Sequence, residues 1–198
     1  MSPRPRTASD ADVLAAAARA VGRLGPHRLT LAGVAAEAGL APATLVQRFG
    51  SKRGLLLALA RRGAEETPAE IEVARRTNPS PLAALRAYAE ATAGMARAPE
   101  ELANHLAFLQ IDLTDPDFHA AALAQARAAR EGIRGLLDAA ADAGELAPTD
   151  TAALARAVQT ALNGALLMWA LFREGDAGAW VRADVDAVLR PFAREAGG

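Results

Sequence analysis

Residues 31–49 read LAGVAAEAGLAPATLVQRF and contain two short helical segments on either side of Gly39. In the first segment Val34 is an apolar anchor, and Ala35 is small enough for the second segment to cross closely. Gly39 suits the turn because it has no Cβ. The second segment has an apolar back made of Leu40, Leu45 and Phe49. This spacing predicts a helix-turn-helix.

The other side of the second segment is expected to face outward. It carries Ala43, Thr44, Gln47 and Arg48. A helix of this size enters the major groove of DNA, where side chains read the edges of the bases. We expect Gln47 and Arg48 to hydrogen-bond the bases, because their side chains are polar. We expect Thr44 or Ala43 to contact a thymine methyl group.

The charges of the chain are unevenly distributed around this segment, although the formal net charge is only −1. Residues 1–62 carry ten basic and three acidic side chains, a net +7. The remaining residues carry twelve basic and twenty acidic side chains, a net −8. A basic head on an acidic body is typical of a protein that binds a nucleic acid through one of its domains.

The region around the helix-turn-helix resembles the TetR/AcrR family of bacterial transcriptional regulators, over about residues 9–62. The family pattern is matched by Leu29-Thr30, Val34-Ala35, Ala38-Gly39-Leu40, Leu45, Phe49 and Ser51-Lys52, followed by Leu55-Leu56-Leu57. The resemblance implies a ligand-responsive regulator, most often a repressor. Such a protein binds a palindromic operator in double-stranded DNA as a homodimer and is released by a small-molecule effector.

The readout region departs from the family pattern at two places. Val46 stands where family members usually have Tyr, and Arg48 where they usually have His or Tyr. A base reader of the preceding helix falls on Ala32 or Gly33, which have no polar side-chain group. Readout is therefore expected to rest on few side chains. The alternative is a helical small-molecule binding protein without DNA-binding activity.

Four further residues are expected to contact the DNA backbone or the minor groove. Lys52 is the only lysine of the chain and stands at the start of a helix. Its ammonium group beside the free amides of a first helical turn is suited to hold a phosphate. Thr30 caps the helix before the turn and offers a hydroxyl group. Arg4 and Arg6 are expected to form a minor-groove arm, with a solubilising tail as the alternative.

The composition favours an all-α chain, because about a quarter of the residues are alanine and β-branched and aromatic residues are scarce. Proline and glycine divide the chain into about nine helices. We expect a helix-turn-helix domain at residues 1–50 and a helical effector-binding and dimerisation domain at residues 51–198. Helix 52–67 connects them and ends or kinks at Thr67-Pro68. Later helices are expected at 81–97, 100–113, 116–143, 150–173 and 178–194.

The last two helices carry apolar seams whose members alternate at spacings of four and three residues. The seams consist of Leu154, Val158, Ala161, Ala165, Met168 and Phe172, and of Val181, Val185, Val188 and Phe192. Leu162, Leu166 and Trp169 add a second apolar face to the first of these helices. We therefore expect a homodimer in which this helix pair packs against its counterpart. A central helix fully buried in a monomer is the alternative.

The family resemblance implies an effector compartment among the helices between residues 81 and 143. The candidate lining residues are Tyr88, Thr92, Met95, His105, Phe108, Asp112, Phe118 and Trp169. For each residue, ordinary packing or a solvated position is the alternative. Because the large members are apolar or aromatic, we expect an apolar or aromatic effector of low charge.

No sequence feature indicates an enzyme, a metal site or a cofactor. The chain has no Cys, which excludes thiol catalysis and cysteine-bearing metal sites. Glu101, His105 and Asp112 could bind a metal ion in a metal-dependent enzyme, but three ligands with no fourth are weak evidence. The longest apolar run, Ala161–Phe172, is too short to span a bilayer. We expect a cytoplasmic protein.

Overall fold

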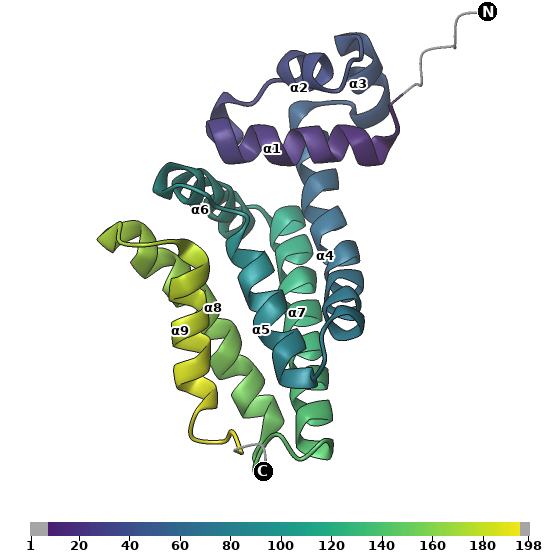
Figure 1. Ribbon diagram of the computed structural model, residues 1–198. Coiled ribbons are helices and arrows are strands. Elements are labelled where there is room, and N and C mark those ends of the chain that lie inside the picture. Colours follow the sequence, from purple (N-terminus) through teal and green to yellow (C-terminus); the bar gives the residue numbers. More distant parts are fainter. Residues whose placement is uncertain (1–7, 195–198) are drawn as a thin grey trace, which may run out of the picture. The chain divides into compact units, whose positions relative to one another are not determined.

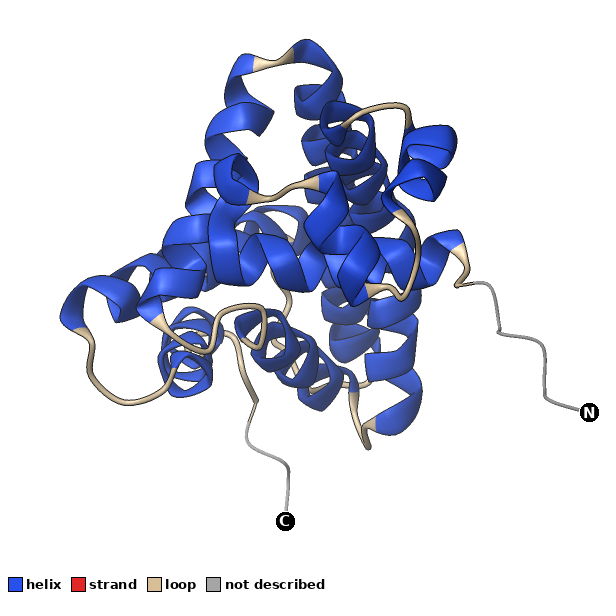
Figure 2. Cartoon of the chain, turned by 90° about the horizontal axis from the view of Figure 1, so that it is seen from above, coloured by secondary structure: helices blue, strands red, loops and turns tan. Residues whose placement is uncertain are grey.

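The computed structural model describes residues 8–194, and this part of the chain folds into nine helices without a β-strand (Figures 1 and 2). The helices are α1 (Asp10–Arg28), α2 (Leu31–Glu37), α3 (Pro42–Phe49), α4 (Lys52–Thr77), α5 (Pro81–Ala93), α6 (Pro99–Thr114), α7 (Pro116–Asp142), α8 (Thr151–Phe172) and α9 (Ala177–Leu189). The predicted all-α fold with about nine helices is confirmed. Two helices end earlier than expected, α5 at Gly94 and α9 shortly before Pro191.

The helices pack into two compact units that do not follow the order of the chain. The first unit consists of the described residues up to Arg62 and of Ala103–Ala122. The second consists of Gly63–Leu102 and of the described residues from Leu123 onward. Helices α4, α6 and α7 therefore each contribute to both units. The domain border at residue 50 stays a prediction, and nothing in the local sequence pattern indicates that 103–122 joins the head.

The first helix shows how local signals set the boundaries of the head. Ser9 caps α1 through a capping box, in which its hydroxyl accepts from the Asp12 N–H and the Asp12 carboxylate accepts from the Ser9 N–H. Gly25 then leaves the helical region at φ 74° and ψ 162°, so the regular helix ends there as the Gly25-Pro26 pair predicts. The chain adds one more turn, up to Arg28.

Helix α4 does not end at Thr67-Pro68, the first of the two expected outcomes, but continues through Pro68 to Thr77. The hydroxyl of the buried Thr67 donates to the carbonyl of Gly63 at 2.8 Å, a local bond within the helix. Pro68 is exposed, so water can bond the carbonyl that loses its N–H partner. A proline on the solvent side is thus compatible with a continuous helix.

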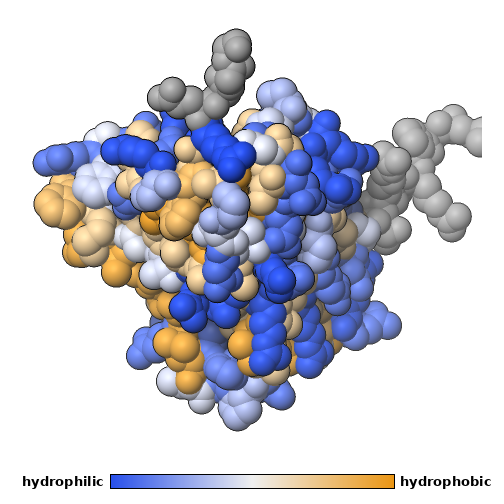
Figure 3. Space-filling model, turned by 90° about the horizontal axis from the view of Figure 1, so that it is seen from below, coloured by the Kyte–Doolittle hydropathy of each residue, from blue (hydrophilic) through white to orange (hydrophobic). Residues whose placement is uncertain are grey.

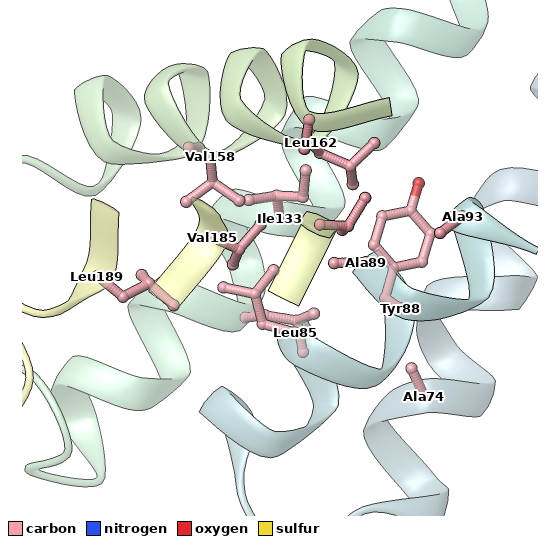
Figure 4. Packing of buried hydrophobic residues seen from close by; sticks show 14 of the residues in the cluster. Ala74, Leu85, Tyr88, Ala89, Ala93, Ile133, Val158, Leu162, Val185 and Leu189 are labelled. Atoms are coloured by element: carbon pink, nitrogen blue, oxygen red, sulfur yellow. The ribbon is translucent and has the colours of Figure 1, made fainter. Parts of the chain in front are cut away.

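The core of the second unit is built mainly from α5, α7, α8 and α9, with Ile71 and Ala74 of α4 and Leu102 of α6. Figure 4 shows Leu85 and Ala89 of α5 facing Ile133 of α7, with Val158 of α8 and Val185 of α9 completing the contact. Each of these five residues is at most 1% exposed. Burial of a large aliphatic side chain contributes about 1.5–3 kcal/mol, so this cluster is the main source of stability of the unit.

Apolar surface also reaches solvent, in patches between polar side chains (Figure 3). The most exposed large apolar residues are Leu113, Leu171 and Phe172, at 68%, 67% and 60%. Among the described residues, no helix combines the length and the apolar character needed to cross a membrane.

Candidate nucleic-acid interface

Helices α2 and α3 form the helix-turn-helix that the sequence predicts. The N–H of Gly33 donates to the hydroxyl of Thr30 at 3.0 Å, which caps α2. Gly39 has φ 68°, a conformation that favours glycine, and makes the turn. Val34 and Leu45, at 1% and 0% exposure, anchor the two helices in the core of the first unit. The predicted motif is confirmed.

The outward side of α3 lies opposite the buried Leu45. At about 100° per residue, Ala43 and Gln47 are each about 160° from Leu45 around the helix axis. Thr44 and Val46 are about 100° away and flank them. Ala43 and Gln47 are exposed, Thr44 is half-buried, and Val46 is 51% exposed. Val46 was missed as a candidate contact, although its angular position alone would have indicated it.

Arg48 is an exposed residue but lies away from the centre of this outward side, and its expected base contact stays a prediction. It lies only about 60° from Leu45, because three residues bring a helix almost back to the same side. Its guanidinium donates to the carbonyl of Ala8 at 2.7 Å and pairs with the Asp10 carboxylate at 3.2 Å. The side chain is 25% exposed. Arg48 therefore connects α3 to the start of α1.

The residues expected to contact phosphates or the minor groove are Lys52, Thr30, Arg4 and Arg6, and the structure describes the first two. Lys52 is the first residue of α4, as predicted, and its Nζ donates to the carbonyl of His27 at 2.7 Å. An ammonium group has three donors, so two remain for other partners. Thr30 is exposed beside its capping bond. Arg4 and Arg6 lie outside the described residues.

Most other basic side chains of the first unit are engaged within the protein. Arg19 and Arg23 pair with Glu37 at 2.9 and 2.5 Å and so connect α1 to α2. The hydrogen bond from Arg23 holds the pKa of Glu37 below its usual value. Among the described residues up to Arg62, Arg28 and Arg61 are the basic side chains without an ion pair or side-chain hydrogen bond. They are further candidates for phosphate contacts.

Segment 103–122 is held to the head by polar contacts at both ends. The Asn104 amide donates to the carbonyl of Gly22 at 2.7 Å. Arg53 pairs with Asp115 at 2.9 Å and Asp117 at 2.8 Å, and its guanidinium lies 5.5 Å from the ring centre of Phe118. The three acidic residues of the segment lower the formal charge of the unit from +7 to +4.

The predicted effector residues are divided between the two units, and several have packing roles. The first unit contains His105, Phe108, Asp112 and Phe118, and the second contains Tyr88, Thr92, Met95 and Trp169. Tyr88, Phe118 and Trp169 are 8%, 2% and 5% exposed and belong to the two cores. Thr92 donates to the carbonyl of Tyr88, and Met95 is 44% exposed. For the three buried aromatic residues, the structure thus shows the packing role that the sequence left open.

Asp112 is the unusual member of this set. Its Oδ1 atom is buried without a hydrogen-bond partner, and burial raises the pKa of this carboxyl to about 6.

In the second unit, a surface depression of about 470 Å³ is lined by Trp169 together with charged side chains, Glu90, Arg97, Asp176 and Arg182 among them. Trp169 is the only predicted effector residue in its lining.

A metal site receives no support from the described residues, because no three of their His, Asp or Glu side chains converge where an ion could bind. The Glu101 carboxylate accepts a hydrogen bond from the Arg97 N–H at 2.8 Å. The alternative of a metal centre made by Glu101, His105 and Asp112 is therefore not supported.

Most of the predicted dimer residues are buried or partly buried within the chain, so the dimer interface stays a prediction. Leu154, Val158, Ala165, Val181 and Val185 are at most 4% exposed and pack α8 and α9 into the core. Ala161, Val188 and Phe192 are partly buried. The predicted residues Met168 and Phe172 are exposed, and Leu167 and Leu171 add to the exposed apolar surface of α8. The spacing of the two seams is correct, but it identifies an intramolecular contact.

The chain is thus an all-α protein with a helix-turn-helix at its N-terminal end. Residues 13–59 match the model of the bacterial regulatory proteins of the tetR family. PfmR, a TetR family transcriptional regulator from Thermus thermophilus, is 26% identical, with a TM-score of 0.64 over 90% of this chain and 97% of that chain. The helix-turn-helix region thus matches the tetR family, and the chain has the fold of TetR family transcriptional regulators.

Two further solved structures share this fold. SmeT, the repressor of the Stenotrophomonas maltophilia multidrug efflux pump SmeDEF, is 22% identical, with a TM-score of 0.68 over 96% of this chain and 92% of that chain. The complex of SmeT with triclosan is 21% identical, with the same TM-score over 94% and 92%. No curated protein sequence matches the chain.

Proposed function

We propose that the protein is a ligand-responsive transcriptional repressor that binds a palindromic operator as a homodimer and is released by a small-molecule effector. The observation that carries this proposal is the helix-turn-helix, whose second helix presents Ala43 and Gln47 to solvent directly opposite its buried anchor Leu45. The fold shared with SmeT, a repressor also solved with triclosan, supports the regulatory role.

Affinity for DNA would come mainly from phosphate contacts. Lys52 has two free donors beside its bond to His27, and the exposed Arg28 carries a guanidinium without an intramolecular partner. Each neutralised phosphate releases condensed counterions, so binding weakens steeply as salt rises. The bond to His27 also holds the Lys52 ammonium in a fixed position, which lowers the entropic cost of a phosphate contact.

Dimerisation would use the exposed apolar side of α8, which includes Met168 and Phe172 of the predicted seam, rather than the buried seam residues. Leu167, Met168, Leu171 and Phe172 continue toward its C-terminal end a stripe that contains Gly164. A Cβ placed on Gly164 would meet no atom within 4 Å, so this position is open to a partner helix. An interface between identical subunits must match its own surface, and a single helix crossing its counterpart satisfies this condition.

Release by an effector requires that ligand binding in the second unit changes the conformation of the first unit. Helices that belong to both units can transmit such a change. Helices α4 and α6 each run from one unit into the other without a break. An effector that binds one conformer of the second unit better would shift the population of head arrangements and lower operator affinity.

The test is a gel shift with the full chain and DNA from the region upstream of its own gene. We expect a retained band at low salt that is lost when the effector is added. Failure to retain any fragment at low salt, combined with ligand binding, would support the alternative of a small-molecule binding protein.

A further inference from the structure

The side of α3 that faces away from the protein is largely apolar. We call the four residues Ala43, Thr44, Val46 and Gln47 the reading face. Three of them present methyl groups, and Val46 is 51% exposed. Gln47, near the centre of this face, and the hydroxyl of the half-buried Thr44 supply its hydrogen-bonding groups.

No guanidinium or ammonium group belongs to the reading face. Arg48 is the only basic residue of α3, and it lies toward α1, held by the Ala8 carbonyl and the Asp10 carboxylate. Helix α2 adds no cationic base reader either, because its exposed positions are Ala32, Gly33, Ala36 and Glu37. The Glu37 carboxylate is paired with Arg19 and Arg23. The groups that recognise guanine through its O6 and N7 atoms are therefore missing from this surface.

The chemistry that remains selects other bases. Methyl groups of Ala, Val and Thr make favourable contacts with the C5 methyl of thymine, and a glutamine amide pairs with N6 and N7 of adenine. We infer that α3 reads its half-site through thymine methyl groups and one adenine, and that Arg48 is a positioning residue that fixes α3 against α1. This inference rests on the proposed DNA binding and adds the class of base that is read.

Base analogues test this directly on the full-length protein. Duplexes recovered from a random-sequence pool by binding are resynthesised with uracil at single thymines, which removes only the C5 methyl. Each methyl buried against the protein contributes about fourfold in Kd. We expect at least one thymine per half-site to show a loss of this size. Replacement of guanine by 7-deazaguanine, which removes the N7 acceptor, should change Kd less than twofold.

Variants assign the effect to the reading face. For the Val46→Ala protein, we compare the Kd of the uracil-containing duplex with that of the thymine-containing duplex. This ratio should fall toward one at one thymine position of the half-site. Val73→Ala is a matched control, because Val73 is a similarly exposed valine, at 48%, on α4. It should leave the ratio unchanged.

Arg48 and Asp10 test the positioning role. Arg48→Ala and Asp10→Asn should both weaken binding to all duplexes alike, with the uracil ratio and the fold, checked by circular dichroism, preserved. If Arg48 read guanine, Asp10→Asn would free it and leave binding intact or stronger. A loss of tenfold or more with 7-deazaguanine, together with no effect of uracil, would overturn the inference. Absence of any enriched duplex would instead refute DNA binding itself.

Discussion

The Nζ atom of Lys52, the first residue of α4, donates a hydrogen bond of 2.7 Å to the carbonyl oxygen of His27, in the last turn of α1. This bond joins the helix that follows the helix-turn-helix to the helix that precedes it. It also fixes the position of the only lysine ammonium group of the protein, which keeps two further N–H donors for other partners.

Substitution of Lys52 by alanine is expected to weaken binding to every DNA sequence by a similar factor. The plot of log K against log salt should become shallower by about one unit, because one phosphate contact is lost. Fluorescence anisotropy over a salt series measures this slope. Arg76→Ala is the control, since it removes a cation from the other end of α4. An unchanged slope in Lys52→Ala would show that the lysine has no phosphate partner.

Gly25→Ala is expected to destabilise the protein by about 2 kcal/mol, because φ is 74° and the new Cβ would lie 2.8 Å from Oδ1 of Asn104. Combining it with Asn104→Ala should cost less than the sum of the two changes, since the clash disappears. Urea denaturation measures both values. Gly135→Ala is the control: it lies in α7 with open space around its Cβ position, and alanine should stabilise it by about 0.5–1 kcal/mol. Strict additivity would contradict the predicted contact.

Asp112 should make stability depend on pH in an unusual direction. Its carboxyl pKa is about 6 in the folded protein against an ordinary 3.8, so the folded state binds the proton more tightly. Proton binding at Asp112 therefore adds to the free energy of unfolding. This contribution is fully present below about pH 4 and is lost as pH rises through about 6. Asp112→Asn should remove this loss and gain on the order of 1 kcal/mol at pH 7, a value reduced for solvent screening because the group is only half-buried.

Chemical unfolding at pH 4 and pH 7 checks this prediction. The wild-type protein and Asp112→Asn should differ more at pH 7 than at pH 4. Asp142→Asn, at an exposed position of α7, is the control and should show no such difference. Equal changes in both variants would mean that the buried oxygen has a polar partner in solution.

Leu171→Glu is expected to convert the proposed dimer to a monomer, because it puts a charge into the exposed apolar side of α8. Leu113→Glu is a close control, since the two leucines are 67% and 68% exposed, on α8 and α6. Sedimentation velocity distinguishes the outcomes. A Leu171→Glu protein that sediments like the wild type would place the interface elsewhere.

The sequence predicted those parts of the fold that depend on local signals. The turn at Gly39 and the buried Leu45 each follow from a few neighbouring residues. Pro68 does not end α4, although a proline often ends a helix, because its effect depends on which side of the helix it occupies.

Features that join distant parts of the chain were not predictable in the same way. The bond between Asn104 and Gly22 connects residues 82 positions apart, and no local pattern indicates it. Arg48 was assigned to the outward side although the angular spacing from Leu45 places it toward α1. The apolar seam that includes Val158 identifies a helix contact, but its spacing cannot distinguish a partner within the chain from one in another subunit.

Selection of DNA from a random-sequence pool by the full-length protein tests the central claim most directly. We predict an enriched inverted repeat whose half-sites are one helical turn apart, about 10 base pairs from centre to centre or a multiple of it. Two protein chains should be bound per duplex. A pool that shows no enriched motif after repeated rounds at low salt would contradict the account.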